Sequence, residues 1–480
     1  MLVSIRNGHG SRIGPRAVEP GTVAHRDWTS AMSTITFDVP DVHDAIDADR
    51  SLRVRGGRSL QGEVRVRGAK NTLPKSMVAA LLTDQECVLR NVSGIRDVEI
   101  VGRMIRALGG EVEHTGSGEI RMRVVDLAPL GREEAAAFSG RSRIPVLLCG
   151  PLLNRVGELF IPDLGGCNIG PRPIDFHLEA LTELGAIVHE STDGVRLTAR
   201  RLHGAKIRLP YPSVGATEQV LLSAVLAEGV TELSNAAIEP EIIDLIAVLQ
   251  KMGATISVET DRVITINGVE QMHGFEHSAL PDRLETASWA CAALATDGRI
   301  FVSGAHQLDM MTFLNAFRRV GGDFRVSDEG IEFWRAGPLR SVALETDVHP
   351  GFMTDWQQPF VVALTQAKGV SIVHETVYED RFGYTSALND MGAQIQLYRE
   401  CLGGRSCRFG QRNHQHSAVI VGPTPLHGTE INIPDLRAGF SYVIAALVAD
   451  GLSTITNVGL IRRGYEHFED KLLALGADLV

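Results

Sequence analysis

The chain has 480 residues, of which 44% are hydrophobic, so it is too long for one ordinary core and has enough apolar side chains for several. Its formal net charge of -11 argues against a general nucleic-acid surface, although a local anion site is compatible with it. The six cysteines are few and irregularly spaced, which favours a reducing compartment over a disulfide-stapled secreted fold.

Residues 1–50 are expected to form a flexible extension. They hold scattered Arg, His, Gly and Pro and then an Asp-rich piece, a composition that buries little apolar surface. They lack the continuous hydrophobic segment of a signal peptide, and no apolar run approaches the length of a membrane span. We therefore expect a soluble, cytoplasmic protein without membrane contact, which starts at Met1 or Met32.

After this extension the chain repeats one unit with a period of about 70 residues. In each copy a helical pattern ends at a glycine that reads as the helix C-cap, and in all but the last copy an alternating strand follows. The six endings are Leu108-Gly109, Leu184-Gly185, Met252-Gly253, Val320-Gly321, Met391-Gly392 and Leu475-Gly476.

Each unit also contains an earlier apolar helix that closes in glycine, as over 217–229. Asp282 followed by Glu285 has the pattern of a capping box at one of these helices. The units predict an α/β protein of two domains, three units each, with a cleft between them and a seam at 280–282. The other early helices are expected to begin near Leu73, Pro145, Arg283, Trp356 and Arg437.

Charged residues stand at the starts of several early helices, among them Lys70, Asp355 and Arg437. Helix N-termini present free N–H groups and positive dipole ends, so a cleft onto which they converge would hold anions. The alternative is a capping role alone, which is the expectation for Asp282 and Asp435.

A loop over 163–175 combines one thiol and one guanidinium with three glycines and two prolines. Such a composition forms neither a helix interior nor a central strand. Cys167, flanked by glycine and close to Arg172, is in a setting where a thiol can be exposed and acidified. A structural role is the alternative for a lone cysteine.

Eight short motifs lie at 68–71, 165–175, 213–217, 280–283, 354–355, 379–382, 435–438 and 463–466. Together, they resemble the motifs of the UDP-N-acetylglucosamine enolpyruvyl transferase family. The related enolpyruvyl-shikimate-phosphate synthase shares the six-unit fold but lacks the Gly-Gly-Cys loop. The resemblance implies two inverse α/β-barrel domains, one over 70–279 with the Cys loop and the other over 51–69 plus 280–480.

The resemblance also implies the reaction and the partners. Protonation of phosphoenolpyruvate at C3 creates cation character at C2, a hydroxyl of a uridine nucleotide attacks, and the tetrahedral product loses phosphate. No metal or organic cofactor takes part, and a monomer or weak homo-oligomer is expected. Cys167 is implied as the acid and Asp355 as the base that takes the hydroxyl proton.

The remaining implied site residues bind the two substrates. Arginines are prominent among them, and guanidinium groups suit carboxylate and phosphate. The implied phosphoenolpyruvate clamp is Lys70, Arg143, Arg172, Arg437 and Arg463. The implied acceptor side is Asn71, Arg172, Pro173, Asp175, His177, Ser213, Val214, Gly215 and Arg381, with a surface salt bridge as the alternative for Arg381.

Three departures from the family pattern bear on the acceptor. Leu147 stands where the family has tryptophan, Tyr211 where a lysine near the diphosphate is expected, and Arg462-Arg463 where Asp-Arg is usual. The default acceptor is UDP-N-acetylglucosamine, as in the first committed step of peptidoglycan synthesis. Alternatives are UMP or a related nucleotide in nucleoside antibiotic biosynthesis, or a regulator without catalysis.

The chain carries an extra segment between Gln396 and Val419 that contains two cysteines and two histidines. Zinc is one interpretation, but Cys401 and Cys407 are too widely spaced for a common knuckle, and His414 and His416 would point oppositely on a strand. We therefore expect a basic insertion and no metal.

Overall fold

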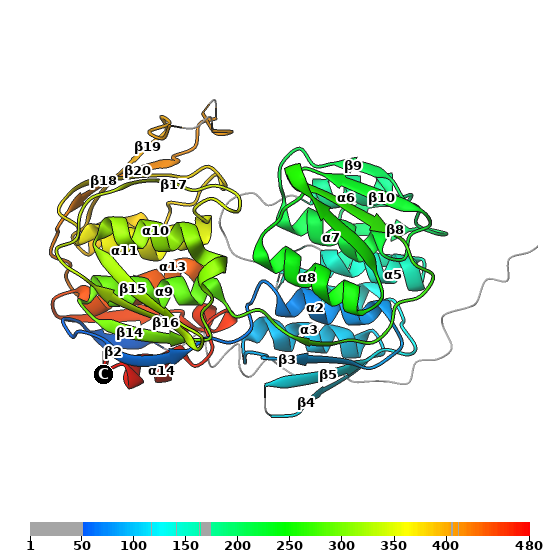
Figure 1. Cartoon of the computed structure of the whole chain (residues 1–480), viewed down its shortest axis with the longest axis horizontal. Coiled ribbons are helices and arrows are strands. Elements are labelled where there is room, and N and C mark those ends of the chain that lie inside the picture. Colours follow the sequence, from blue (N-terminus) through cyan, green and yellow to red (C-terminus); the bar gives the residue numbers. More distant parts are fainter. Residues whose placement is uncertain are drawn as a thin grey trace, which may run out of the picture. The chain divides into compact units, whose positions relative to one another are not determined.

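The structure is a computed structural model that describes residues 51–116, 118–140, 142–162, 164, 174–404, 407–410 and 412–480. These residues fall within one compact unit over 43–480 and form a mixed α/β fold (Figure 1). In the described part of the chain, no helix is both long and apolar enough to cross a membrane.

The described residues form six sheets that follow one plan. Five have four strands and one has three, and each four-stranded sheet contains one parallel outer pair beside two antiparallel pairs. Three sheets belong to 70–279, which we call the first half: β13 (Glu276–Ser278), β3 (Cys87–Arg90), β5 (Glu119–Arg123), β4 (Glu111–His114); β6 (Glu158–Pro162), β8 (Gly194–Thr198), β7 (Ile187–Ser191); and β11 (Thr255–Glu259), β12 (Val263–Asn267), β10 (Val230–Ser234), β9 (Lys206–Arg208).

The other three sheets belong to 51–69 and 280–480, which we call the second half. They are, in spatial order, β15 (Gly322–Ser327), β16 (Gly330–Arg335), β14 (Arg299–Ser303), β2 (Gln61–Arg65); β17 (Ala343–Glu345), β18 (Gly369–His374), β20 (Ser417–Gly422), β19 (Gln394–Tyr398); and β21 (Glu430–Asn432), β22 (Leu452–Thr456), β1 (Leu52–Arg55), β23 (Asp478–Leu479).

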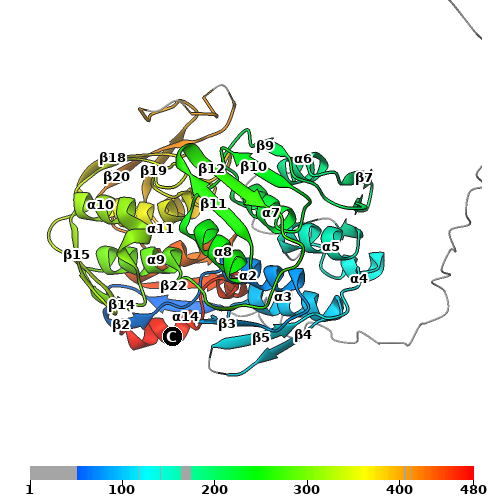
Figure 2. The same cartoon turned by 45° about the vertical axis from the view of Figure 1, so that its right-hand side comes forward.

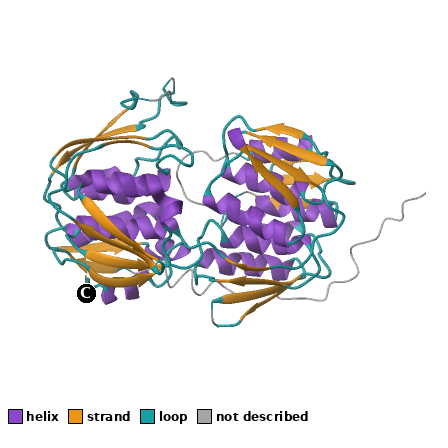
Figure 3. Ribbon diagram, viewed as in Figure 1, coloured by secondary structure: helices purple, strands orange, loops and turns teal. Residues whose placement is uncertain are grey.

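The early helix of each unit lies inside its half, with the strands outside (Figure 3). All 13 residues of α9 are buried, and α9, α11 and α13 contact one another. These helices begin within three residues of the predicted starts: α2 (Leu73–Ala79), η2 (Ile144–Leu148) continuing into α5 (Cys149–Arg155), α7 (Val214–Ala224), α9 (Arg283–Ala295), α11 (Thr354–Thr365) and α13 (Leu436–Val448). The helix predicted over 217–229 is shorter at its C-terminal end, because α7 stops at Ala224.

The six predicted C-cap glycines are confirmed. Gly109, Gly185, Gly253, Gly321, Gly392 and Gly476 all have φ between +89° and +114°, a conformation that glycine adopts without steric cost. The strand that we did not expect after the last of them is present as the short β23. The helices that end next to the six glycines are α3 (Arg96–Ala107), α6 (Asp175–Glu183), α8 (Pro240–Lys251), α10 (Met311–Val320), α12 (Thr385–Asp390) and α14 (Phe468–Ala474). The remaining described helices are short: η1 (Ala80–Leu82), α4 (Arg132–Ala136), η3 (Thr260–Arg262), η4 (Gln307–Met310) and η5 (Val458–Arg463).

Asp282 and Asp435 both cap helices, as predicted. Asp282 Oδ1 accepts from the N–H groups of Leu284 and Glu285, at 2.7 and 3.1 Å, at the start of α9. The expected capping box is wrong, because the Glu285 carboxylate turns into the core. There it accepts hydrogen bonds from Trp289 Nε1 and Lys471 Nζ.

The chain passes between the two halves at two adjacent points. The Ala69 N–H donates to the Leu280 carbonyl and the Asp282 N–H to the Arg67 carbonyl, both at 2.8 Å. Each half has its own hydrophobic core, one over 73–279 and the other over 52–66 and 284–477. The division into two domains at the expected boundaries stays a prediction.

The segment between β19 and β20 extends beyond the ends of these strands (Figures 1 and 2). It brings Cys401 and Cys407 next to His374, at the end of β18, and His416, just before β20. The argument from the opposite directions of His414 and His416 therefore does not apply to the two cysteines, because His374 lies beside them in place of His414. His414 turns instead toward Asp380, with 3.4 Å between Nδ1 and Oδ1.

Candidate functional site

Every predicted site residue that the structure describes lines a single cleft of about 560 Å³. Both halves contribute to its walls. Three predicted residues, Cys167, Arg172 and Pro173, lie outside the described residues. The twelve that line the cleft are Lys70, Asn71, Arg143, Asp175, His177, Ser213, Val214, Gly215, Asp355, Arg381, Arg437 and Arg463.

The predicted convergence of helix starts on the cleft is confirmed. The first residues of η2, α7, α9, α11 and α13 line it, together with Lys70 and Asn71 just before α2. At α7, Ser213 Oγ accepts from the Ala216 N–H at 3.3 Å. The positive ends of these helices line one space, which suits an anionic ligand.

A buried carboxylate, Asp97 in the first turn of α3, joins two of the predicted clamp cations. Lys70 Nζ donates to Asp97 Oδ2, and Arg463 Nε lies 3.3 Å from Oδ1. Burial by itself would raise the pKa of Asp97, but the two cations hold it below its usual value. Asp97 thereby orients one cation from the first half and one from the second.

Sequence reasoning missed Asp97. An acidic residue in the first turn of a helix is the ordinary complement to the helix dipole, so its position carries no separate signal. Its role becomes visible only when α3 and η5 are placed side by side, as they are here.

Asp355 projects from the first turn of α11 and is held by two arginines. Arg381 Nη2 donates to Asp355 Oδ1, and Arg437 Nε lies 4.0 Å from the same oxygen. Arg381 is buried, with its guanidinium over the ring of Tyr378, so the surface salt bridge is excluded for it. The two arginines hold the Asp355 carboxylate in place at the wall of the cleft.

Arg437 keeps its charge although it is buried. Burial acts to lower its pKa, but nearby Tyr465 and Asp355 outweigh that effect and raise it. Arg437 Nη1 donates to the Tyr465 hydroxyl at 3.4 Å, and the Tyr465 ring stacks on Phe440 with centroids 4.4 Å apart. The aromatic pair fixes the guanidinium at the wall of the cleft.

Two contacts shape the wall of the cleft around the start of α7 and Tyr211. A Cβ on Gly215 would lie 3.0 Å from His177 Nε2, so glycine lets the start of α7 approach His177. Tyr211, which stands where a lysine is expected, faces a cation from the other half: the Arg408 guanidinium lies 4.3 Å from its ring centroid. Sequence reasoning missed Arg408, because it lies in the extra segment.

The other two departures have simple structural readings. Leu147 is buried and lines the cleft as an apolar side chain. Arg462 donates to Glu469 at 3.0 Å and is absent from the lining of the cleft, so the Arg462-Arg463 pair places one arginine there.

Glu218 predicts a pH dependence of stability. It is buried in the cleft wall, 3.5 Å from Lys75, and burial raises its pKa from 4.5 to about 7. Between these values the folded chain holds a proton that the unfolded chain releases, so the free energy of unfolding falls as pH rises. Glu218→Gln should remove this fall, of about 3 kcal/mol in total.

Urea unfolding of the wild type and Glu218→Gln between pH 4.5 and 8 measures this effect. The stability of the variant relative to the wild type should grow across the range, whereas Glu329→Gln, at an exposed turn, should track the wild type. A stability difference between Glu218→Gln and the wild type that stays constant with pH would contradict the expectation.

Known proteins with similar sequences identify the family of this chain. Residues 54–472 match the family EPSP synthase (3-phosphoshikimate 1-carboxyvinyltransferase). The UDP-N-acetylglucosamine 1-carboxyvinyltransferase of Protochlamydia amoebophila is 50% identical over 435 residues, which cover 89% of this chain and 93% of that protein. The protein of the same name from Chlamydia muridarum is 49% identical over 436 residues, covering 89% and 98%.

Solved structures share the fold. The enolpyruvyl transferase NikO from Streptomyces tendae has a TM-score of 0.79 at 24% identity, covering 90% of this chain and 99% of that one. EPSP synthase from Acinetobacter baumannii has a TM-score of 0.68 at 16% identity, with the same coverage. The chain therefore belongs to the EPSP synthase (3-phosphoshikimate 1-carboxyvinyltransferase) family and, within it, to the group of UDP-N-acetylglucosamine 1-carboxyvinyltransferases.

Proposed function

We propose that the protein transfers the enolpyruvyl group of phosphoenolpyruvate to a hydroxyl of UDP-N-acetylglucosamine and releases phosphate. The observation that carries this proposal is the cleft, in which all twelve described site residues meet. Relatives of about half-identical sequence bear the name of this activity and support the choice of acceptor.

The cations of the cleft would hold phosphoenolpyruvate. Lys70 and Arg463, joined by Asp97, and Arg437, fixed by Tyr465, present charged donors from both halves. Guanidinium forks match carboxylate and phosphate oxygens, and they would neutralise the phosphate as it leaves. Arg143 lines the same cleft, and Arg172 is assigned to the clamp from the sequence alone.

Asp355 is the proposed base and Cys167 the proposed acid. Asp355 would take the proton of the acceptor hydroxyl as that oxygen bonds to C2, while Cys167 supplies a proton to C3. In the second step a proton would leave C3 as the bond between C2 and the phosphate oxygen breaks, which restores the C2=C3 double bond and releases phosphate. Asn71 would position the amino sugar. The start of α7, with Ser213, Val214 and Gly215, would bind on the nucleotide side together with Asp175, His177 and Pro173.

We further infer that each half is an inverse α/β barrel, and that the halves are two domains closing over the substrates. The buried early helices and the outer sheets support the first point, and the paired chain crossings at Ala69 and Leu280 support a hinge. A cytoplasmic place in the first committed step of peptidoglycan synthesis is part of the same proposal, without an organic cofactor and as a monomer or weak homo-oligomer.

Competing acceptors test the function. With phosphoenolpyruvate and equal amounts of UDP-N-acetylglucosamine, UDP and UMP in one reaction, we expect phosphate release and an enolpyruvyl product of the amino sugar, identified by mass. Each contact that UMP cannot make is worth about 1–3 kcal/mol, or roughly ten- to a hundred-fold in specificity. Exclusive transfer to UMP would overturn the acceptor, and the absence of phosphate release with every acceptor would overturn the enzyme.

A further inference from the structure

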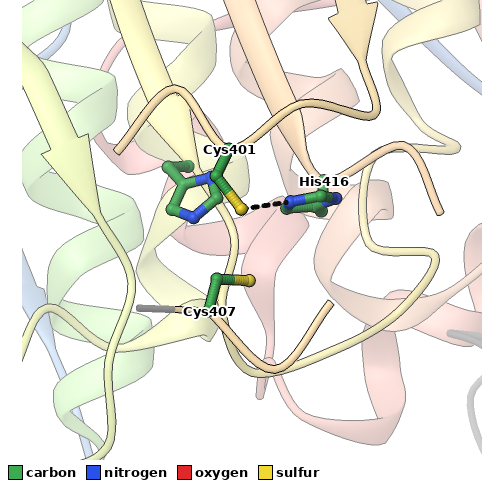
Figure 4. Close-up of side chains that lie close together, drawn as sticks. Cys401, Cys407 and His416 are labelled. Carbon is green, nitrogen blue, oxygen red and sulfur yellow. Dashed lines mark hydrogen bonds between the residues drawn. The ribbon is translucent and has the colours of Figure 1, made fainter. Parts of the chain in front are cut away.

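Four potential metal-binding side chains meet at the outer end of the sheet β17-β18-β20-β19. Donor atoms of His374, Cys401, Cys407 and His416 all lie within 4.8 Å of one another. Cys401 Sγ lies 3.3 Å from His416 Nε2, and Figure 4 shows the two thiols and the His416 ring directed at one space. Sheet pairing places His374 opposite Ser417, and this brings the two histidines together.

The hydrogen bonds of His374 leave the lone pair of its Nε2 atom without a donor among the described residues. The Ser417 hydroxyl donates to the Glu400 carbonyl at 2.7 Å, so it must accept from His374 Nδ1, 2.8 Å away. With the hydrogen on Nδ1, Nε2 carries the lone pair. That Nε2 is buried and has no hydrogen-bond partner among the described residues.

His416 is held in the same tautomer. Its Nδ1 lies 2.9 Å from the His414 carbonyl, which can only accept, so Nδ1 carries the hydrogen and Nε2 the lone pair. Both rings therefore donate through Nδ1 to fixed protein oxygens, and the Nε2 lone pair of each ring can bind a metal. A metal-bound histidine typically has this second partner, which sets its tautomer and orientation.

The extra segment is shaped around the cluster. A Cβ on Gly403 would lie 2.5 Å from His374 Cδ2, so only glycine lets the chain pass so close to the ring. The Phe409 N–H donates to Cys407 Sγ at 3.3 Å, a contact that fixes the position of this sulfur. Phe409 is fully buried beside His416, with ring centroids 6.0 Å apart.

We propose that His374, Cys401, Cys407 and His416 bind one zinc ion in a closed, structural four-ligand site. Two thiolates and two imidazoles in a tetrahedral arrangement are a donor set typical of zinc. Bond lengths of about 2.0–2.3 Å place tetrahedral ligand atoms about 3.3–3.8 Å apart, so the pair Cys401–His416 already has this spacing and small movements close the rest.

The metal site also positions a cation in the cleft. Arg408 follows Cys407 directly, and its guanidinium lies over Tyr211 of the other half and donates to the Val377 carbonyl. Zinc fixes the segment that carries Arg408. This arginine supplies the positive charge that the chain lacks at position 211, where it has Tyr211 in place of a lysine. This second step rests on the proposed function, because it assigns Arg408 to the acceptor diphosphate.

Metal content tests the site without any activity assay. The full chain, purified under reducing conditions, loaded with zinc and desalted, should carry one zinc per chain by elemental mass spectrometry. X-ray absorption at the zinc edge should show two sulfur and two imidazole ligands in the wild type, a readout that does not depend on whether a variant folds. A zinc-free chain, a shell without sulfur, or a Cys401–Cys407 disulfide in the reduced preparation would overturn the site.

Variants locate the ligands. Cys401→Ser and Cys407→Ser should lose zinc to a chelator that leaves the wild type loaded. His414→Gln is the matched control: it removes a nearby imidazole, keeps the carbonyl that His416 needs, and should retain zinc. Zinc retention by both serine variants would show that the metal sits elsewhere.

The kinetics of Arg408 test the coupling. Removal of zinc should raise KM for UDP-N-acetylglucosamine about tenfold with little change in kcat, as expected for one lost contact to the acceptor. Arg408→Gln should show the same rise with zinc still bound, and chelation should add nothing further to it. Additive effects would overturn the coupling. A chain that binds zinc but transfers enolpyruvate to no acceptor would instead refute the proposed function and leave the metal site standing.

Discussion

Replacing Asp355 by asparagine is expected to lower turnover about 10²- to 10⁴-fold, the usual contribution of a positioned acid or base. Asparagine keeps the shape of the side chain but cannot accept the hydroxyl proton. Since Arg381 and Arg437 both lie against Asp355 Oδ1, an amide oxygen there preserves much of the local packing. Steady-state phosphate release measures the loss.

Measurements of acceptor binding and of unfolding show whether the lost turnover comes from the chemistry or from a damaged fold. The variant should bind UDP-N-acetylglucosamine in calorimetry and unfold cooperatively. Asp328→Asn, at the exposed turn between β15 and β16, is the control for loss of a carboxylate and should turn over at the wild-type rate. An Asp355→Asn enzyme with nearly full kcat would remove Asp355 from the chemistry.

Cys167→Ala is expected to lose turnover by about a hundredfold or more, because no acid would reach C3 of phosphoenolpyruvate. The thiol should also be the one that fosfomycin alkylates. Three other cysteines are poor nucleophiles by comparison: Cys87, Cys149 and Cys291 are buried, and burial raises the pKa of Cys87 to about 11.

Peptide mapping after fosfomycin treatment checks this prediction. The label should fall on Cys167 in the wild type and disappear in Cys167→Ala, whereas Cys87→Ala should still be labelled and still turn over. A label on another cysteine, or normal turnover of the Cys167→Ala enzyme, would refute the assignment.

Much of the fold was predictable because its signals are local. A glycine that ends a helix adopts positive φ for reasons contained in one residue, and all six predicted positions do so. The early helices likewise begin where apolar spacing places them. The capping box at Glu285 failed for the opposite reason: Trp289 and Lys471 compete for the carboxylate, and Lys471 comes from a distant helix.

The candidate site divides in the same way. Short motifs and the family resemblance identified twelve residues that meet in the cleft, and several of them, such as Lys70, Asp355 and Arg437, stand at or just before a helix start. Asp97, Arg408 and His374 belong to no such motif. Their significance arises from contacts with Arg463, Tyr211 and the Cys401–Cys407 pair.

The amino-acid sequence by itself therefore determined the repeated units, the helix ends and the family to which the motifs belong, since these depend on residues close together in the chain. Tertiary structure alone decided which charges share a carboxylate, which cation faces Tyr211, and that His374 rather than His414 joins the two thiols. The physical reason is that strand pairing and segment folding bring together residues far apart in sequence, such as His374 and Ser417, and no local pattern records that register.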